Sequence, residues 1–190
     1  MTTWVGIDYG SKLAGTTVIC YKKNDYLHFL QSEKKSDADV IISRFIKEHN
    51  PDFIYLDAPL SLPGVYSGAG DDYFYRACDK TTKAMSPMFL GGLTARAMKL
   101  KAGLPGTKFR ESYPSYYIKV IMEYGEDYAK RKPYFNVISD KLIEEYALVL
   151  SDMPTNWHQL DALTCYVIGL RHERGEGQVF GQADEGLIYV

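Results

Sequence analysis

The sequence predicts an α/β domain built on a mixed β-sheet with flanking helices. Three β-type segments joined by tight turns come first, and an amphipathic helix and a wholly apolar segment follow them. A continuous apolar run is typical of a strand that is buried on both faces of a sheet. The 190 residues are 46% hydrophobic and 24% charged, which is ordinary globular composition and excludes a disordered or fibrous chain. We therefore expect one domain, 1–190, that opens in the order β-β-β-α-β.

The first three strands are expected at 4–9, 14–21 and 26–32. These runs are rich in β-branched residues or alternate between apolar and polar residues. Gly10-Ser11-Lys12 and Lys23-Asn24-Asp25 have the composition of turns. Three consecutive strands with short turns predict an antiparallel meander.

The amphipathic helix follows the meander, with Ser36 or Asp37 as its cap. Its predicted apolar stripe consists of Val40, Ile41, Phe45 and Ile46. Asn50-Pro51 ends the helix, and the apolar run 53–56 is the fourth strand, with Asp57 directly after it.

The chain after this strand is less regular. Residues 60–107 are expected to form an insertion or lid on the core, because Pro, Gly, Ser and aromatic residues interrupt the first part of this segment. It should hold two helices, over 71–83 and 93–101. The remaining expected elements are a strand at 108–112, helices over 113–124 and 136–150, a last helix capped by Asn156, and a terminal hairpin or extended tail at 177–190.

Charge is segregated along the chain. The net charge of −2 is a poor match to a general nucleic-acid binder, which needs a basic surface. Residues 76–110, however, carry eight basic residues against one acid. A segment of this kind can form a local anion-binding face. Charge alone favours a solvated surface on which basic residues happen to cluster, and it is together with the acidic site described below that we expect the segment to face a phosphate backbone.

Cysteine usage and the N-terminus indicate the compartment. Cys20, Cys78 and Cys165 form no CxxC spacing, so we expect buried, reduced thiols in a cytoplasmic protein. The chain enters a strand pattern at once, which predicts no signal peptide, and no apolar run is long enough to span a membrane. The sequence leaves the oligomeric state open.

Four acids stand in or beside apolar sequence: Asp8, Asp57, Glu111 and Asp161. An ionised carboxylate in such a place needs a basic partner, a helix N-terminus or a metal ion. If the first and fourth strands are parallel neighbours, Asp8 and Asp57 meet at the carboxyl edge of the sheet, and the last helix can bring Asp161 there. Hard oxygen ligands suit Mg²⁺ or Mn²⁺, and a pair of such ions can activate water and hold a phosphate.

Three of these acids also have a simpler interpretation. Asp57 before Ala-Pro suits a turn, Asp161 suits the first turn of a helix, and Glu111 follows Arg110, which predicts an ion pair.

Several other residues are candidates for contacting phosphate. The loop from Gly6 to Gly15 can turn backbone N–H groups toward a phosphate, and Lys12 adds charge to it. Arg96 and Lys99 are i, i+3 neighbours, as are His158 and Asp161, so each pair shares a helix face. His158 could equally be a surface residue at a helix end.

Arg76 is a further candidate for phosphate contact. For this residue we favour an i, i+3 ion pair with Asp79.

Taken together, these motifs resemble those of two groups of known proteins. The run Gly6-Ile7-Asp8-Tyr9-Gly10-Ser11-Lys12 is similar to the opening of bacterial Holliday-junction-resolvase-like proteins, and Trp157 to Leu163 resembles their last-helix motif. The wider resemblance is to a family of uncharacterised prokaryotic proteins described as predicted nucleases of ribonuclease-H-like fold. Its marks occur here in order: Asp8, Asp57-Ala58-Pro59-Leu60-Ser61-Leu62-Pro63, Arg76-Ala77-Cys78-Asp79, Glu111-Ser112-Tyr113-Pro114 and Leu160-Asp161-Ala162-Leu163.

The resemblance implies a ribonuclease-H-like fold and a divalent-metal nuclease acting on structured or short nucleic acid. The metal ligands would be Asp8, Asp57 and Asp161, with Glu111 as a fourth ligand or a group that orients water. Where members of the family often have a second acid, this chain has Ser115. That departure leaves Glu111 alone in its motif.

Two other functions are open on the sequence. An actin-like or sugar-kinase-type ATPase lobe also opens with a strand, Asp and a glycine turn, but two lobes normally clamp a nucleotide. A catalytically silent domain that binds nucleic acid or protein is compatible with Ser115 and with the low charge.

Overall fold

The structure is a computed structural model, and it describes residues 2–125 and 132–190. The strands are β1 (Trp4–Asp8), β2 (Val18–Lys23), β3 (Tyr26–Gln31), β4 (Phe53–Asp57), β5 (Lys108–Ser112), β6 (Val179–Gln182) and β7 (Gly186–Tyr189). The helices are α1 (Ala38–His49), α2 (Ala77–Thr82), α3 (Pro87–Leu90), α4 (Gly92–Ala102), α5 (Pro114–Tyr116), α6 (Lys132–Tyr146) and α7 (Trp157–Glu173). A 3₁₀ turn η1 (Gly64–Ser67) and a π-helical turn η2 (Tyr117–Ile121) complete the elements.

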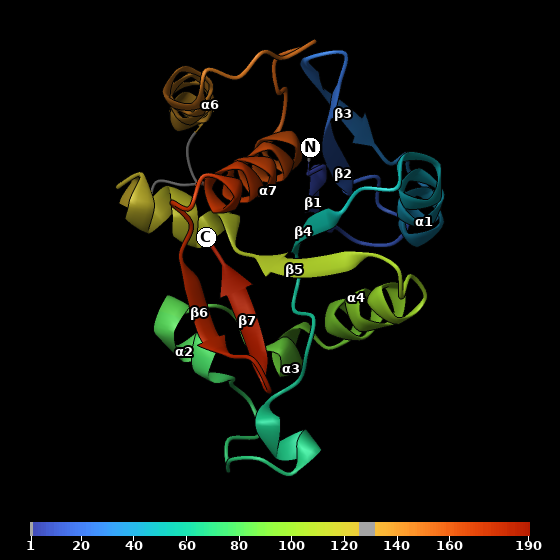
Figure 1. Cartoon of the computed structure of the whole chain (residues 1–190), viewed down its shortest axis with the longest axis vertical. Coiled ribbons are helices and arrows are strands. Elements are labelled where there is room, and N and C mark those ends of the chain that lie inside the picture. Colours follow the sequence, from blue (N-terminus) through green and yellow to red (C-terminus); the bar gives the residue numbers. More distant parts are fainter. Residues whose placement is uncertain (1, 126–131) are drawn as a thin grey trace.

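The strands form one sheet in the order β3-β2-β1-β4-β5-β7-β6. The first three pair as an antiparallel meander, while β4 and β5 run parallel to β1. This order, with its β-β-β-α-β start, is the ribonuclease-H-like arrangement, so the expected α/β fold class is confirmed (Figure 1). The terminal residues form the hairpin β6–β7, and β7 pairs parallel with β5. The sequence predicted a terminal hairpin or an extended tail there, but not the pairing of the hairpin with the sheet.

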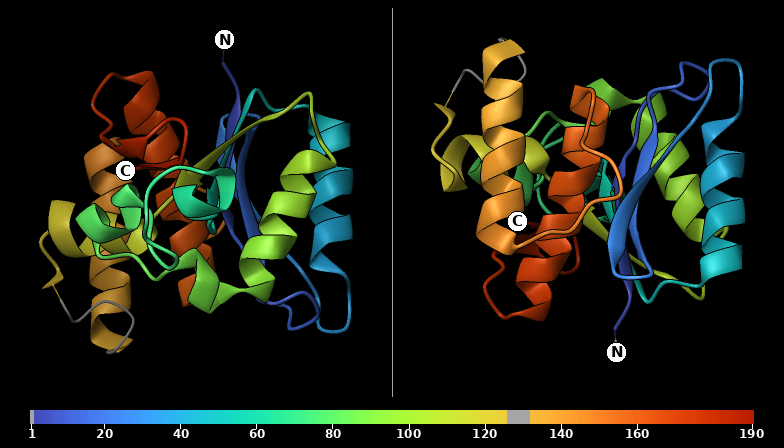
Figure 2. Two further views of the ribbon diagram at one scale, coloured as in Figure 1. Left: turned by 90° about the horizontal axis from the view of Figure 1, so that it is seen from below. Right: turned by 90° about the horizontal axis from the view of Figure 1, so that it is seen from above.

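Helices cover both faces of the sheet. Figure 2 shows α1 and α4 on one side and α6 and α7 on the other. Side chains alternate along β1, because successive residues of a strand point to opposite faces. Val5 and Ile7 therefore pack in the core beneath α1 and α4, and Gly6 lies under α7. Asp8, next in the alternation, also belongs to the α7 face.

Gly6 permits a close approach between β1 and α7. A Cβ atom at this position would lie 2.2 Å from the backbone nitrogen of Tyr166 and 2.4 Å from the carbonyl oxygen of Ala162. Only a residue without a side chain fits there. The first glycine of the sequence motif thus sets the distance between the helix that carries Asp161 and the strand that carries Asp8.

Several predicted elements need correction at their ends. The second strand begins at Val18, not at residue 14, because residues 14–17 still belong to the turn region. The helix expected over 71–83 covers only Ala77–Thr82, since the Asp72 carboxylate accepts hydrogen bonds from two following backbone N–H groups in a local turn. The helix expected over 136–150 lies at Lys132–Tyr146 and is followed by Ala147 with a φ of 49°.

Two further helix predictions differ from the structure. Residues 113–124 form the short α5 and the π-helical turn η2 in place of one continuous helix. In α1 the buried residues are Ala38, Ile42, Phe45 and Ile46. Val40, which was assigned to the apolar stripe, is 52% exposed. The cap is Asp37, whose carboxylate accepts hydrogen bonds from two backbone N–H groups of the first turn.

The segment between β4 and β5 contains η1, α2, α3 and α4. Its last helix, α4, packs on the sheet beside α1 through Ala97 and Leu100. Cys20, Cys78 and Cys165 are buried, free thiols, as predicted. In the part of the chain that the structure describes, no helix has the length and apolar character needed to cross a membrane.

Candidate functional site

Two acids lie side by side at the carboxyl ends of β1 and β4. The strands are parallel and in register, so that Asp8 is the direct partner of Asp57. Both end short buried strands whose other residues fill the core. The alternation along each strand places both carboxylates on the face covered by α7. The predicted meeting of these two acids at one sheet edge is therefore present in the structure.

Asp8 is bound by a histidine from α7. Its side chain is nearly inaccessible, and its Oδ2 lies 2.8 Å from Nδ1 of His158. Burial raises the pKa of Asp8, and the contact with His158 opposes that shift. The same hydrogen bond raises the pKa of His158, whose side chain is 42% exposed. His158 is therefore a partner of a buried acid and not only a surface residue at a helix end.

Asp57 lies among other acids, whose negative charges oppose its ionisation. Its pKa is raised well above the ordinary value, first by burial and then by the charges of Asp8, Asp161 and Glu111. Among residues 2–125 and 132–190, no hydrogen bond or ion pair reaches its carboxylate. A carboxylate in this setting is stabilised by a proton or by a cation.

The third acid comes from α7. Asn156 caps this helix, and its side chain accepts a hydrogen bond from the Gln159 N–H. Leu160 and Leu163 are fully buried on either side of Asp161, which is itself half-buried. The charge of Asp161 contributes to the raised pKa of Asp57. The structure thus brings the three predicted metal-binding acids to one end of the sheet.

Glu111 has different bonding partners from these three acids. In the register of β5 it pairs with Leu56, whose side chain belongs to the core under α1 and α4, so it faces away from α7. Both of its carboxylate oxygens accept hydrogen bonds from Arg76, at 2.7 and 2.6 Å. The Leu60 N–H donates to one of them at 2.9 Å.

Arg76 is fully buried and also binds Asp79, at 2.7 and 3.0 Å. The ion pair that we favoured for it is confirmed, and a buried side chain of this kind cannot face a phosphate backbone. The expectation that the whole 76–110 segment does so is therefore wrong at this residue. The sequence reasoning missed the link from Arg76 to Glu111 and assigned the ion pair of Glu111 to Arg110. Arg110 lies instead over the ring of Phe53, with 3.8 Å from its guanidinium carbon to the ring centroid.

A cavity opens over the strand ends. It has a volume of about 310 Å³, and Asp8, Asp57 and Glu111 line it. Met85 and Leu90, from the segment between β4 and β5, contribute apolar walls. A site of this size admits a small group such as a phosphodiester with part of its sugar.

The glycine loop uses two of its backbone N–H groups locally. The N–H of Gly10 donates to the Thr17 hydroxyl at 3.1 Å, and that of Ser11 donates to the Thr16 hydroxyl at 3.2 Å. Gly10 and Ser11 therefore do not offer these two donors to a phosphate. Lys12 is half-exposed and forms a salt bridge of 2.9 Å with Asp37.

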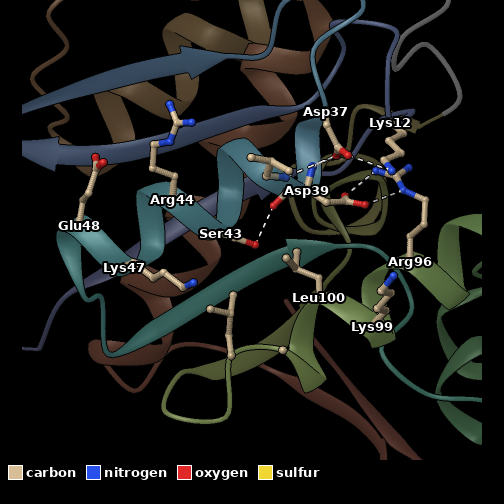
Figure 3. A pocket seen from close by; sticks show the side chains of 13 residues that line it. Lys12, Asp37, Asp39, Ser43, Arg44, Lys47, Glu48, Arg96, Lys99 and Leu100 are labelled. Atoms are coloured by element: carbon tan, nitrogen blue, oxygen red, sulfur yellow. Dashed lines mark hydrogen bonds and ion pairs between the residues drawn. The ribbon is translucent and has the colours of Figure 1, made fainter.

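The two predicted basic residues of α4 differ. Arg96 binds Asp39 through two hydrogen bonds, of 3.1 and 2.7 Å, and donates to the carbonyl of Gly10. Lys99 is exposed and lines a groove between α1 and α4 (Figure 3). Of the two, Lys99 is the side chain without an ion pair among the described residues.

The fit to a metal ion is partial. In the ranges 2–125 and 132–190, no group of three or more His, Cys, Asp or Glu side chains lies close enough together to hold an ion. The donor chemistry fits, because three carboxylates gather and Asp57 is opposed by like charge. Binding an ion through all three therefore requires side chains to turn, Asp8 away from His158 first of all.

Comparisons with known proteins give a distant structural likeness. No protein-family model matches the sequence, and no curated protein matches it. The T. thermophilus RuvC structure in complex with a Holliday junction substrate is similar with a TM-score of 0.46 and 12% identity, over 92% of this chain and 97% of that chain. A likeness this low does not transfer an activity, so function rests on the side chains of this chain.

Proposed function

We propose that this protein is a divalent-metal-dependent nuclease, with Asp8, Asp57 and Asp161 as ligands for Mg²⁺ or Mn²⁺. The observation that supports this most is the electrostatics of Asp57, whose pKa is raised by burial and by the charges of three other acids at the carboxyl end of the sheet. Folding a chain around such a group costs stability unless something positive binds there. Carboxylates with strongly raised pKa values are found mainly at functional sites.

The chemistry follows from the ligand type. Hard carboxylate oxygens prefer Mg²⁺ or Mn²⁺, and two such ions supply an activated water and stabilise a leaving phosphate oxygen. Asp57 is the central ligand, and Asp8 and Asp161 flank it from β1 and α7. In the metal-free site His158 binds Asp8, and its ring reaches solvent, where it can contact a phosphate once Asp8 turns toward the ion. Glu111 helps to fix this end of the sheet through Arg76 and lines the same cavity.

The substrate is inferred from charge. Bound divalent ions would turn an acidic site into one that attracts phosphate. The net charge of −2 favours a local grip on a short or structured nucleic acid over a long non-specific contact.

A cleavage assay tests the proposal. Branched DNA, an RNA–DNA hybrid and single strands are incubated with the protein and Mg²⁺ or Mn²⁺, with and without a chelator. We expect chelator-sensitive cleavage of at least one substrate. Asp57→Asn and Asp8→Asn should each lower the rate by at least about 100-fold, the scale for losing a group that stabilises transition-state charge.

Asp140→Asn is the matched control. Asp140 is an exposed residue on α6, away from the strand ends, so the same chemical change should leave the rate unchanged. Cleavage that persists in chelator, or that is equal in Asp8→Asn and the parent, would refute the mechanism. Binding without cleavage under all conditions would show a catalytically silent nucleic-acid-binding domain.

A further inference from the structure

A groove runs between α1 and α4 on the sheet face opposite α7. It has a volume of about 600 Å³. Its charged lining residues are the bases Lys12, Arg44, Lys47, Arg96 and Lys99 and the acids Asp37, Asp39 and Glu48. The floor is in part apolar, with Leu100, Leu104 and the half-exposed Val40.

Four of these eight charged residues are paired with one another within the groove. Lys12 pairs with Asp37 and Arg96 with Asp39, at one end of the groove (Figure 3). Arg44 and Glu48 have opposite charges four residues apart on α1, and both side chains extend away from α4 in Figure 3.

Two lysines are left over. Lys47 on α1 and Lys99 on α4 are exposed, and neither has an ion pair among the described residues. They stand on the two helices that wall the groove (Figure 3). Unpaired cations on opposite walls make the groove a site for an anion, and an apolar floor between them suits the sugar or base of a nucleotide.

The groove and the cavity over the strand ends share α4 as a wall. Leu93 of α4 lines the cavity, and Lys99 and Leu100 of the same helix line the groove. Leu93 and Lys99 are six residues apart, which on a helix is about 9 Å. At roughly 3.4 Å per nucleotide along a stacked strand, this corresponds to about three nucleotides.

We propose that this groove binds the phosphate backbone of a single nucleic-acid strand that leaves the strand-end cavity, with Lys47 and Lys99 as its phosphate contacts. This inference rests on the proposed nuclease function. It adds the class of substrate, a nucleic acid that is single-stranded next to the cleaved bond. A groove of this volume holds a few nucleotides of one strand. A duplex, whose major groove alone is about 12 Å across, is too bulky for a groove of about 600 Å³.

Binding is measured without cleavage. A fluorescein-labelled 12-nucleotide single strand is titrated in chelator, and anisotropy is read over a range of salt concentrations. Lys47→Gln together with Lys99→Gln should weaken binding by about 2- to 30-fold, the range for losing two exposed charge contacts. The slope of log affinity against log salt should fall by about 1.4, or about 0.7 for each lost contact with a single strand.

Lys23→Gln together with Lys101→Gln is the matched control. Both residues are exposed, and Lys101 lies on α4 without lining the groove. This variant should keep the parent affinity and salt slope. Equal affinity and slope for the groove variant, the control and the parent would overturn the inference.

The two proposals fail separately. If the groove variant binds like the parent while Asp57→Asn abolishes chelator-sensitive cleavage, the groove assignment is wrong and the nuclease stands. If the groove variant loses binding but no metal-dependent cleavage occurs, the nuclease is wrong and the groove is the binding face of a silent domain. A duplex that binds more tightly than the single strand, with the same dependence on Lys47 and Lys99, would overturn the choice of substrate.

Discussion

Arg76 is the residue whose removal should do most damage to the fold beside the site. Its side chain is fully buried and makes five hydrogen bonds, to Asp79, Glu111 and Ser61, with lengths of 2.6 to 3.0 Å. Arg76→Met keeps a long side chain but removes the charge and all five donors. The variant leaves two buried carboxylates without their counter-charge.

The expected cost follows from that burial. Removing one partner of a buried ion pair costs about 3–5 kcal/mol, because the remaining charge is left unpaired. For a chain of this length, about 2–4 °C of melting temperature corresponds to each kcal/mol. Arg76→Met should therefore melt about 6–20 °C below the parent in a thermal scan at pH 7.

The pH dependence of the stability loss in Arg76→Met, and a second substitution, identify the cause of that loss. The unpaired carboxylates of Asp79 and Glu111 in Arg76→Met can be neutralised by protons, which the folded variant then binds more tightly than the unfolded chain. Its stability should therefore approach that of the parent as pH falls from 7 to 4. Adding Glu111→Gln to Arg76→Met should recover part of the loss.

A matched control separates burial from charge. Lys80 lies one helical turn after Arg76, is exposed, and pairs with Asp72. Lys80→Met should therefore leave the melting temperature unchanged. A loss for Arg76→Met below about 1 kcal/mol, or one that stays the same between pH 7 and 4, would refute the reasoning.

Two further substitutions test the electrostatics and the packing of the site. Because the pKa of Asp57 is raised in the folded state, its ionised form opposes folding above about pH 4. Asp57→Asn should then stabilise the metal-free protein by about 0.5–2 kcal/mol at pH 7, lose that advantage below pH 4, and show less stabilisation by Mn²⁺ than the parent in thermal scans. Gly6→Ala should cost about 1–3 kcal/mol and weaken Mn²⁺ binding in calorimetry, because the new methyl group forces α7 away from β1. Gly92→Ala, with no atom within 4 Å of the added carbon, should do neither.

The part of the site that could be predicted from sequence is the part set by local pattern. Asp8 and Asp57 each end an apolar strand, and parallel neighbouring strands bring such ends together. Asp161 could be placed because the helix of Leu160 and Leu163 must lay its apolar side on the sheet. The three positions needed no knowledge of side-chain orientation.

The partners of the charged side chains could not be predicted in the same way. Arg76 and Glu111 are 35 residues apart, and their contact depends on the face that Glu111 takes in β5. Lys12 and Arg96 were predicted to contact phosphate, yet they pair with Asp37 and Asp39 at the start of α1. Charge counted along the chain therefore overstated the positive surface that is free to bind phosphate.

The central claim is that Asp8, Asp57 and Asp161 share a divalent ion. A crystal structure of the protein soaked in Mn²⁺, with anomalous scattering used to locate the metal, tests it most directly. We predict an Mn²⁺ peak within about 2.0–2.6 Å of oxygens from all three carboxylates, with the Asp8–His158 hydrogen bond broken or lengthened. An empty strand-end cavity at millimolar Mn²⁺, with Asp8 still bonded to His158, would contradict the account.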